Sequence, residues 1–225
     1  MNKNCLIVVA HPDDEVLGCF GTMVKLIHQG WAVYTLILSE GKTSRGHVEL
    51  QEIEILRDEM NAANALIGVS HVSQANFPDN AFDSTPLLEI VKRIEKEILE
   101  VKPSMIFTHH FGDMNVDHQL THKAVLTATR PMRGESVKAI YSMEIPSSTE
   151  WNSFNPTTLF VPNVFSDISE TLDLKIKAMK CYQSELREYP HPRSLQHIKE
   201  LAKVNGTKVG LKYSENFMLV RRIYD

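Results

Sequence analysis

The chain has 225 residues, of which 43% are hydrophobic and 23% are charged, and these values are typical of a globular protein that buries a sizeable core. A formal net charge of −4, with Lys and Arg dispersed along the chain, excludes the basic surface that nucleic acid requires. The three cysteines are far apart, and neither a signal peptide nor a run of about 18 apolar residues is present, so we expect a cytoplasmic protein with no disulfide framework and no membrane anchor.

Apolar runs of strand length alternate with stretches of helical periodicity. In chain order they predict strand 5–10, helix 16–28, strand 31–38, helix 48–66, helix 87–100, strand 104–108, helix 118–129, strand 138–143 and helix 172–182. Residues 146–167 lack periodicity, so we expect an excursion there with one or two short strands. The alternation predicts an α/β fold: a Rossmann-like single domain over residues 1–225, with a mostly parallel sheet and helices on both faces. We expect substrate-side elements from about residue 146 onward, and a homo-oligomer is possible.

Two polar clusters directly follow predicted strands. Residues 10–15, AHPDDE, come after strand 5–10, and residues 109–118, HHFGDMNVDH, come after strand 104–108. Open α/β sheets bind ligands outside the carboxyl ends of their strands. Both clusters are therefore candidates for one functional site.

The first cluster has the residues of a metal-dependent hydrolase. His11 and Asp14 lie three residues apart on a short loop and can converge on one metal ion. Asp13 then remains available as a general base that takes a proton from water. In the alternative interpretation, the three acidic residues of this loop stabilise the start of the following helix. The loop alone leaves both interpretations open.

The second cluster offers a third metal ligand. A catalytic zinc site uses three protein ligands and a water molecule, and the first loop provides two. His109, His110, His118 and His122 are the candidates, and sequence position does not choose among them. His118 and His122 lie one helical turn apart, but the Glu of an H-E-x-x-H site is missing between them.

The segments AHPDDEVLG at 10–18 and NVDHQLTH at 115–122 resemble the LmbE-like or PIG-L family of metal-dependent N-acetylglucosaminyl deacetylases. This family includes the GlcNAc-phosphatidylinositol de-N-acetylases and the deacetylases of mycothiol and bacillithiol synthesis. Further segments carry the same resemblance, at residues 57–68, 76–79, 182–185 and 213–217. The similarity thus spans most of the chain.

The resemblance implies a role for each residue that matches the family motifs. His11, Asp14 and His118 would hold the metal, and Asp13 would be the general base. The implied metal is zinc, while ferrous iron or another divalent ion also suits two histidines and one aspartate. Arg57 falls where the family holds the sugar or its anionic substituent.

Three further residues are candidates for the substrate side of the site. By the same resemblance, Asp117 would orient groups around the metal, or it caps the helix that follows. Asp79 and Arg193 are candidates for binding substrate hydroxyls or phosphate. Structural alternatives exist here too: Asp79 lies in a Pro-Asp-Asn turn, Arg193 lies at a possible helix entry, and Arg57 could pair along its own helix.

One position departs from the family pattern. Family members of the thiol pathways have a histidine three residues before the position of His118. This chain has Asn115 at that place. An asparagine amide can donate a hydrogen bond to an oxyanion but does not titrate near neutral pH. We expect either Asn115 or His110 to assist the oxyanion.

The resemblance implies a hydrolase that removes the N-acetyl group from a small-molecule amino sugar, such as an N-acetylglucosamine conjugate. The alternative is a metal-dependent amidase that acts on a non-sugar acylated amine. A nucleotide-binding module is a third possibility, but the first loop lacks the G-x-G-x-x-G pattern and presents carboxylates instead.

Overall fold

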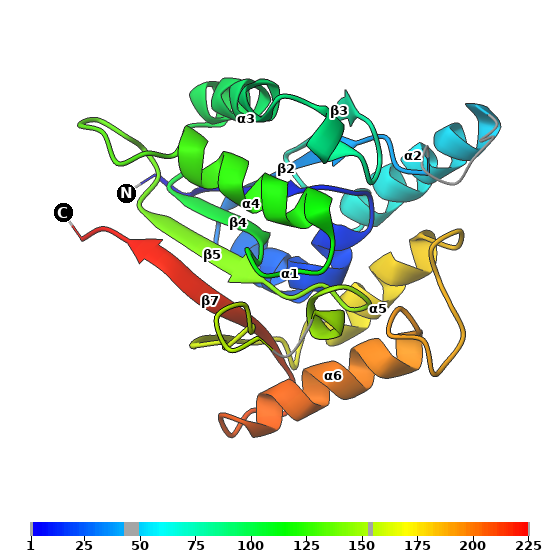
Figure 1. Cartoon of the computed structure of the whole chain (residues 1–225). Helices are drawn as coiled ribbons and strands as arrows, with labels where there is room; N and C mark the ends of the chain where they lie inside the picture. The colour runs from blue at the N-terminus through cyan, green and yellow to red at the C-terminus, as the bar shows by residue number, and fades with distance from the viewer. Residues whose placement is uncertain (1, 43–49, 153–154, 225) are drawn as a thin grey trace.

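The computed structural model describes residues 2–42, 50–152 and 155–224. Within these ranges, seven strands form one sheet in the order β3-β2-β1-β4-β5-β7-β6 (Figure 1). The strands are β1 (Asn4–Val9), β2 (Ala32–Ser39), β3 (His71–Phe77), β4 (Met105–His109), β5 (Ala139–Met143), β6 (Val164–Asp167) and β7 (Ser214–Arg222). Strands β1 to β5 are parallel, and β7 pairs antiparallel with both β5 and β6. The predicted mostly parallel α/β sheet is confirmed.

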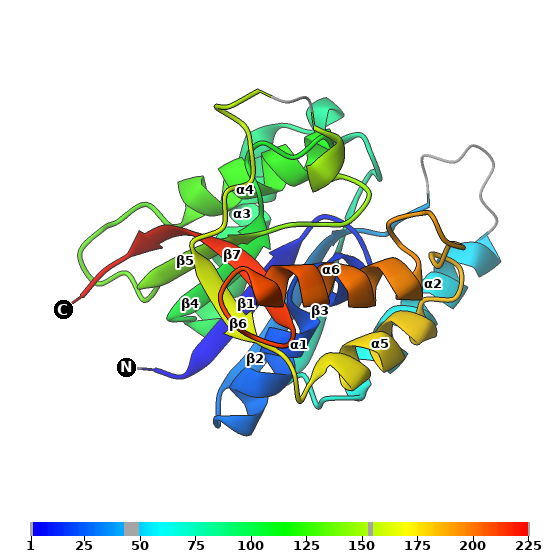
Figure 2. The ribbon, with the colours of Figure 1, turned by 90° about the horizontal axis from the view of Figure 1, so that it is seen from below.

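Helices cover both faces of this sheet, as predicted (Figure 2). One face carries α1 (Asp14–His28), α2 (Leu50–Ala65), α5 (Leu172–Cys181) and α6 (Leu195–Thr207), and the other carries α3 (Leu87–Val101) and α4 (Val116–Ala128). Strand β1 is buried on both sides, because Cys5, Ile7 and Val9 pack with the first group, whereas Leu6 and Val8 pack with the second. None of the helices in the described ranges has the length and apolarity needed to cross a membrane.

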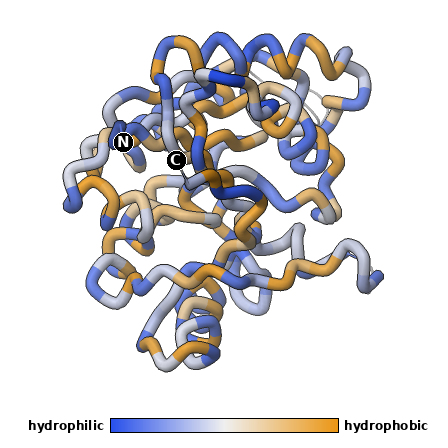
Figure 3. Tube along the Cα trace, turned by 90° about the vertical axis from the view of Figure 1, so that its left-hand side faces the viewer, coloured by the Kyte–Doolittle hydropathy of each residue, from blue (hydrophilic) through white to orange (hydrophobic). Residues whose placement is uncertain are grey.

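Helix α3 shows how the sequence pattern selects a face. Its buried side chains include Ile90, Ile94, Ile98 and Val101, which repeat every three or four residues. In Figure 3, α3 is the helix at the top, and its trace alternates between hydrophobic and hydrophilic colours. This spacing gives one apolar stripe that packs on the sheet, and the charged residues lie mostly outside it, except the buried Glu97, which pairs with Arg93 at 2.7 Å.

Strands β1 and β4 are adjacent in the sheet but lead to opposite faces, because α1 follows β1 on one face and α4 follows β4 on the other. At such a topological switch point, the two loops after the strands diverge and leave a crevice. The loops here are the two polar clusters of the sequence. The fold therefore brings both clusters to one place.

Most predicted elements agree with the structure to within two residues, and three strands or helices of the described ranges, β3, α6 and β7, were not among the predicted elements. The start of the predicted helix 48–66 lies outside the described residues, and the excursion at 146–167 contains one strand, β6. In α6 the buried apolar side chains are Ile198 and Ala202, β7 is largely exposed in its second half, and β3 has one buried residue, Ala75. The two strands have a weak alternating pattern because each is only partly buried, whereas α6 has helical spacing of its apolar residues that the prediction missed.

Helix α1 is interrupted at Cys19, which has non-helical backbone angles (φ −147°, ψ 15°). The backbone N–H groups of Gly21 and Thr22 donate to the buried Glu215 carboxylate of β7 at 3.0 and 2.7 Å. Lys175 of α5 completes this cluster with an ion pair to Glu215 at 2.6 Å and a hydrogen bond to the carbonyl of Leu17 at 2.8 Å. The C-terminal elements α5 and β7 thus fix the position of α1, the helix that follows the loop at residues 10–13.

Candidate active site

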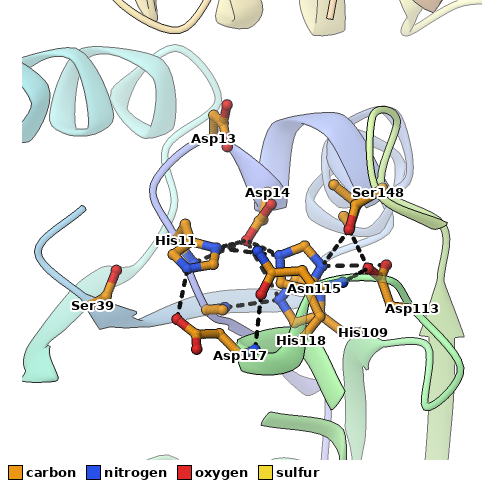
Figure 4. Close-up of polar contacts among 12 residues, drawn as sticks. His11, Asp13, Asp14, Ser39, His109, Asp113, Asn115, Asp117, His118 and Ser148 are labelled. Atoms are coloured by element: carbon orange, nitrogen blue, oxygen red, sulfur yellow. Dashed lines mark hydrogen bonds and ion pairs between the residues drawn. The ribbon is translucent and has the colours of Figure 1, made fainter. Parts of the chain in front are cut away.

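Three side chains from the two switch-point loops converge. His11 Nδ1 lies 3.2 Å from His118 Nε2 and 3.4 Å from Asp14 Oδ2, and His118 Nε2 lies 3.4 Å from the same carboxylate oxygen (Figure 4). His11 is largely buried, and Asp14 and His118 are almost fully buried. These are the three residues for which the sequence predicted a metal site.

The spacing of the three atoms suits a divalent metal ion. A tetrahedral ion with bonds of about 2.0–2.1 Å places neighbouring ligand atoms about 3.3–3.4 Å apart. The second oxygen of Asp14, Oδ1, is buried and has no hydrogen-bond partner among the described residues. A buried carboxylate oxygen without a donor is costly, and a bound cation would compensate for it. The residues present therefore fit the metal that the resemblance implies.

A carboxylate holds the remaining ring nitrogen of each histidine. Asp117 Oδ2 lies 3.0 Å from His11 Nε2, and its other oxygen accepts the backbone N–H of Phe82 at 2.9 Å. Asp113 Oδ2 lies 3.2 Å from His118 Nδ1. Such carboxylate partners orient metal-ligating imidazoles and raise their basicity. Asp117 therefore acts on the site through His11.

The carboxylates favour positive charge between the three candidate ligands. Burial opposes the charged form of His11, but hydrogen bonds with Asp117 and Asp14 raise its pKa to about 10. Burial also opposes the charged form of His118, but the charges of Asp14 and Asp113 raise its pKa to about 9. For Asp14, burial is outweighed by the nearby His118 and His109, which hold its pKa well below the usual range. Protons and a metal cation compete for this position.

Of the other three histidines considered as ligands, His109 lies beside the cluster, with its Nε2 3.5 Å from Asp14 Oδ2, whereas His110 and His122 have other partners. His109 stacks on His118 with ring centroids 3.8 Å apart, and its Nε2 accepts the backbone N–H of Ala10 at 2.8 Å. His122 Nδ1 lies 2.8 Å from the carbonyl of His109. His110 Nε2 lies 2.8 Å from the carbonyl of Thr158. Of the four candidates, His118 is the one that joins His11 and Asp14.

Asp13 has an unusual backbone, with φ of 96° in the left-handed region, and its side chain does not cap α1. Its backbone N–H donates to Glu15 Oε2 at 3.2 Å, and its side chain lies apart from the hydrogen-bonded ligand cluster in Figure 4. Arg193 Nη1 donates to Asp13 Oδ2 at 3.1 Å. Burial raises the pKa of Asp13 well above its usual range, although Arg193 opposes this shift.

Glu15 also holds the loop after β1 in place. This buried carboxylate accepts hydrogen bonds from Tyr182 Oη at 2.6 Å and from Asn64 Nδ2 at 3.0 Å. Burial raises the pKa of Glu15 to about 7, although these hydrogen bonds oppose the shift. Tyr182 is therefore more than a core aromatic, because its hydroxyl fixes the conformation of the loop that carries His11 and Asp14.

A small polar pocket lies beside the candidate ligands. Its lining includes His11, Asp13, Asp79, Asn115 and Arg193. Larger pockets of ≈ 660 and ≈ 810 Å³ lie elsewhere, the first lined by both ends of the chain together with residues 102–104 and 136–138, and the second mostly along α4. Among these pockets of the described residues, the one at the switch point combines the predicted base with a candidate ligand.

Of the remaining predicted site residues, Asp79 and Asn115 line the pocket and Arg57 does not. Asp79 Oδ1 lies 3.3 Å from His11 Nε2, and Asn115 caps α4 by accepting the N–H of Asp117 at 2.8 Å while its Nδ2 donates to Asn80 at 2.9 Å. The suggested cap role of Asp117 is therefore wrong, since Asn115 is the cap. Arg57 is exposed on α2 and does not line the pocket.

Sequence reasoning missed Asp113. This residue accepts hydrogen bonds from Ser148 Oγ, Thr149 Oγ1 and the backbone of Asn115, and it holds His118. It was visible as one of two acidic residues in the second cluster. Its position five residues before His118 did not predict contact, because the turn between them precedes the helix.

Fold and site together define an α/β protein with a candidate mononuclear metal centre at the switch point of its sheet. Residues 6–129 match the family model of PIG-L, the GlcNAc-PI de-N-acetylases, and the chain belongs to this family.

Curated relatives extend the similarity over nearly the whole chain. The diacetylchitobiose deacetylase of Thermococcus kodakarensis is 28% identical, covering 99% of this chain and 85% of the relative. A Bacillus cereus protein named probable N-acetyl-alpha-D-glucosaminyl L-malate deacetylase 2 is 27% identical, covering 82% of this chain and 84% of the relative.

Solved structures share the fold. The N,N'-diacetylchitobiose deacetylase of Pyrococcus horikoshii matches with a TM-score of 0.78 and 21% identity, covering 97% of this chain and 84% of that one. The 4-carboxy-2-hydroxymuconate hydratase GalB of Pseudomonas putida matches with a TM-score of 0.77 and 21% identity, covering 99% and 98%. Because the fold also carries a hydratase, the reaction has to be argued from the site.

Proposed function

We propose that this protein is a metal-dependent hydrolase that removes the N-acetyl group from an amino-sugar conjugate. The observation that supports it best is the position of Asp13, a buried carboxylate that lines the same pocket as His11, one member of the His11, Asp14 and His118 cluster. Family membership and the amino-sugar deacetylases among the relatives support the substrate class.

Zinc is the metal that we propose, with ferrous iron or another divalent ion as the alternative, held by His11, Asp14 and His118. When bound, the metal supplies Lewis acidity that favours deprotonation of water and polarises an amide carbonyl. Asp117 and Asp113 keep the two imidazoles in the orientation that the ligands need.

The protein residues carry the proton steps. Asp13 takes a proton from the attacking water as the new C–O bond forms, and it returns the proton to the nitrogen as the C–N bond breaks, giving acetate and a free amine. Its raised pKa suits it to both steps. We assign the oxyanion contact to Asn115, which lines the pocket, rather than to His110, whose Nε2 contacts the Thr158 carbonyl.

The substrate side of the site is assigned from the same lining. Asp79 lines the pocket and is our candidate for a sugar hydroxyl. Arg57, exposed on α2, would contact the outer part of a conjugate rather than the reacting group. The action of the enzyme in the cytoplasm stays a prediction.

A substrate panel tests this proposal. Protein reconstituted with zinc or ferrous iron is incubated with N-acetylglucosamine, N,N'-diacetylchitobiose and N-acetylglucosaminyl L-malate. N-acetylated amino acids and polyamines serve as non-sugar acetamides, and an unsaturated dicarboxylic acid tests for hydration. We expect acetate from at least one sugar and none from the non-sugar amides. Acetate from the non-sugar amides alone, or hydration without hydrolysis, would contradict the amino-sugar assignment.

A further inference from the structure

Arg193 makes a set of contacts that a substrate-binding arginine does not need. Its Nη1 donates to Asp13 Oδ2 at 3.1 Å and to Glu185 Oε2 at 3.3 Å, and its Nε donates to Ser147 Oγ at 2.8 Å. These partners come from the loop after β1, the turn after α5 and the loop after β5. Three separate segments therefore hold one guanidinium group, which leaves it little freedom to follow a substrate.

The chain around Arg193 is itself anchored. Its backbone N–H donates to His191 Nδ1 at 3.0 Å, and the next residue, Ser194, caps α6 by accepting the N–H of His197 at 3.1 Å. At the other end of the connection between α5 and α6, Ser184 is bound to Glu59 of α2 through its backbone N–H at 3.0 Å and its hydroxyl at 2.7 Å. Figure 2 shows this connection beside α2. The guanidinium is thus presented from a fixed backbone.

Asp13 needs such a partner. Asp13 is 1% exposed. Three acidic residues lie near it, Asp14, Glu15 and Glu185, and their negative charges repel the ionised carboxylate of Asp13. Its side chain does not bond to the end of its own helix. A cation on one carboxylate oxygen fixes the direction of the side chain and offsets this repulsion.

On these contacts we propose that Arg193 is a positioning residue, which holds the carboxylate of Asp13 in the orientation used for proton transfer, and that it does not bind the substrate. This inference deepens the proposed function and rests on it for the role of Asp13. It assigns Arg193 differently from the substrate role expected from the sequence. Glu185 is the second carboxylate of the arrangement and keeps Arg193 in place.

Kinetics separate the two roles of Arg193. Arg193→Ala and Arg193→Lys are compared with Arg187→Ala, a control whose guanidinium contacts the carbonyls of Ser184 and Leu186. For Arg193→Ala we expect kcat to fall about 100-fold or more, as for loss of an aligned general base, with KM within about threefold and unchanged metal content. We expect Arg193→Lys to recover part of kcat, as should guanidinium added to Arg193→Ala. A large rise in KM with kcat intact would overturn the inference.

A structural readout is independent of turnover. In crystals of the metal-loaded Arg193→Ala variant, the Asp13 carboxylate should leave the place it has in the wild type, while His11, Asp14 and His118 keep theirs. If the alanine variant does not fold, Arg193→Lys and Glu185→Gln are compared in the same way. An unmoved Asp13 carboxylate would overturn the inference. If the wild-type protein releases acetate from no substrate, the proposed function fails, and these crystals still decide whether Arg193 positions Asp13.

Discussion

Asp113 Oδ2 lies 3.2 Å from His118 Nδ1, so the nitrogen opposite the candidate metal-binding Nε2 is held by a buried carboxylate. Asp113 is fixed in turn by Ser148, by Thr149 at 2.6 Å and by the N–H of Asn115 at 2.9 Å. The charge of His118 is the strongest influence that lowers the pKa of Asp113, to about 2, against the effect of burial. The carboxylate is therefore ionised at neutral pH and keeps the imidazole oriented.

Asp113→Asn should weaken metal binding without removing a ligand. Loss of a carboxylate that orients a metal-ligating histidine typically lowers metal affinity by about 10- to 100-fold. The measurement is competition with a chelator of known affinity. Asp83→Asn, at an exposed aspartate, is the matched control and should bind metal like the wild type. An Asp113→Asn protein with wild-type affinity would show that this contact does not support the site.

Metal binding should release protons at neutral pH. In the metal-free protein the pKa values of His11 and His118 are raised to about 10 and about 9, so both imidazoles are protonated at pH 7 and must lose a proton to ligate. Asp14 is already ionised because its pKa is lowered. Affinity should therefore fall as pH falls and approach its maximum above about pH 10.

Calorimetry in buffers of different ionisation enthalpy measures the proton count directly. We expect release of about two protons per metal at pH 7, decreasing towards zero above about pH 10. Binding enthalpies that are the same in all buffers at pH 7 would contradict the protonated state of the two histidines.

The Glu215 cluster should be important for stability. Glu215→Gln leaves the buried Lys175 ammonium without its charged partner, and removing one member of a buried ion pair costs about 3–5 kcal/mol in the free energy of unfolding. The exposed pair Lys92–Glu95 is the control, since Glu95→Gln should cost about 0–1 kcal/mol. Urea denaturation measures both.

A double variant separates charge from packing in the same cluster. Lys175→Met combined with Glu215→Gln removes the unpaired charge, so it should be less destabilised than the sum of the two single variants. Additive losses, or a Glu215→Gln protein that unfolds like the wild type, would contradict the proposed support of α1 by this ion pair.

The sequence was sufficient for the parts of the fold that have a strong periodic signal. The apolar run before His11 and the helical spacing of α3 each reflect burial of a whole face, so they were read correctly. Strands β3 and β7 are only partly buried, which weakens the alternation that marks a strand, and α6 was missed although its apolar residues have helical spacing. The antiparallel addition of β7 next to β5 has no local signal at all.

The candidate site was predictable only in part. His11 and Asp14 share one short loop, so their spacing indicated a common ligand, whereas the choice of His118 over its neighbours needed the family resemblance. The contact between Arg193 and Asp13 joins residues 180 positions apart. No local pattern encodes such a contact, because it depends on how the connection between α5 and α6 packs over the loop after β1.

The most direct test of the central claim measures metal content and acetate release on the same samples of wild type, Asp13→Asn and His118→Ala. Asp13→Asn should keep stoichiometric metal and lose turnover by about 100-fold or more, whereas His118→Ala should lose both metal and turnover. Full acetate release by Asp13→Asn would contradict its role as base. Stoichiometric metal in His118→Ala, or no metal bound by the wild type, would contradict the metal centre.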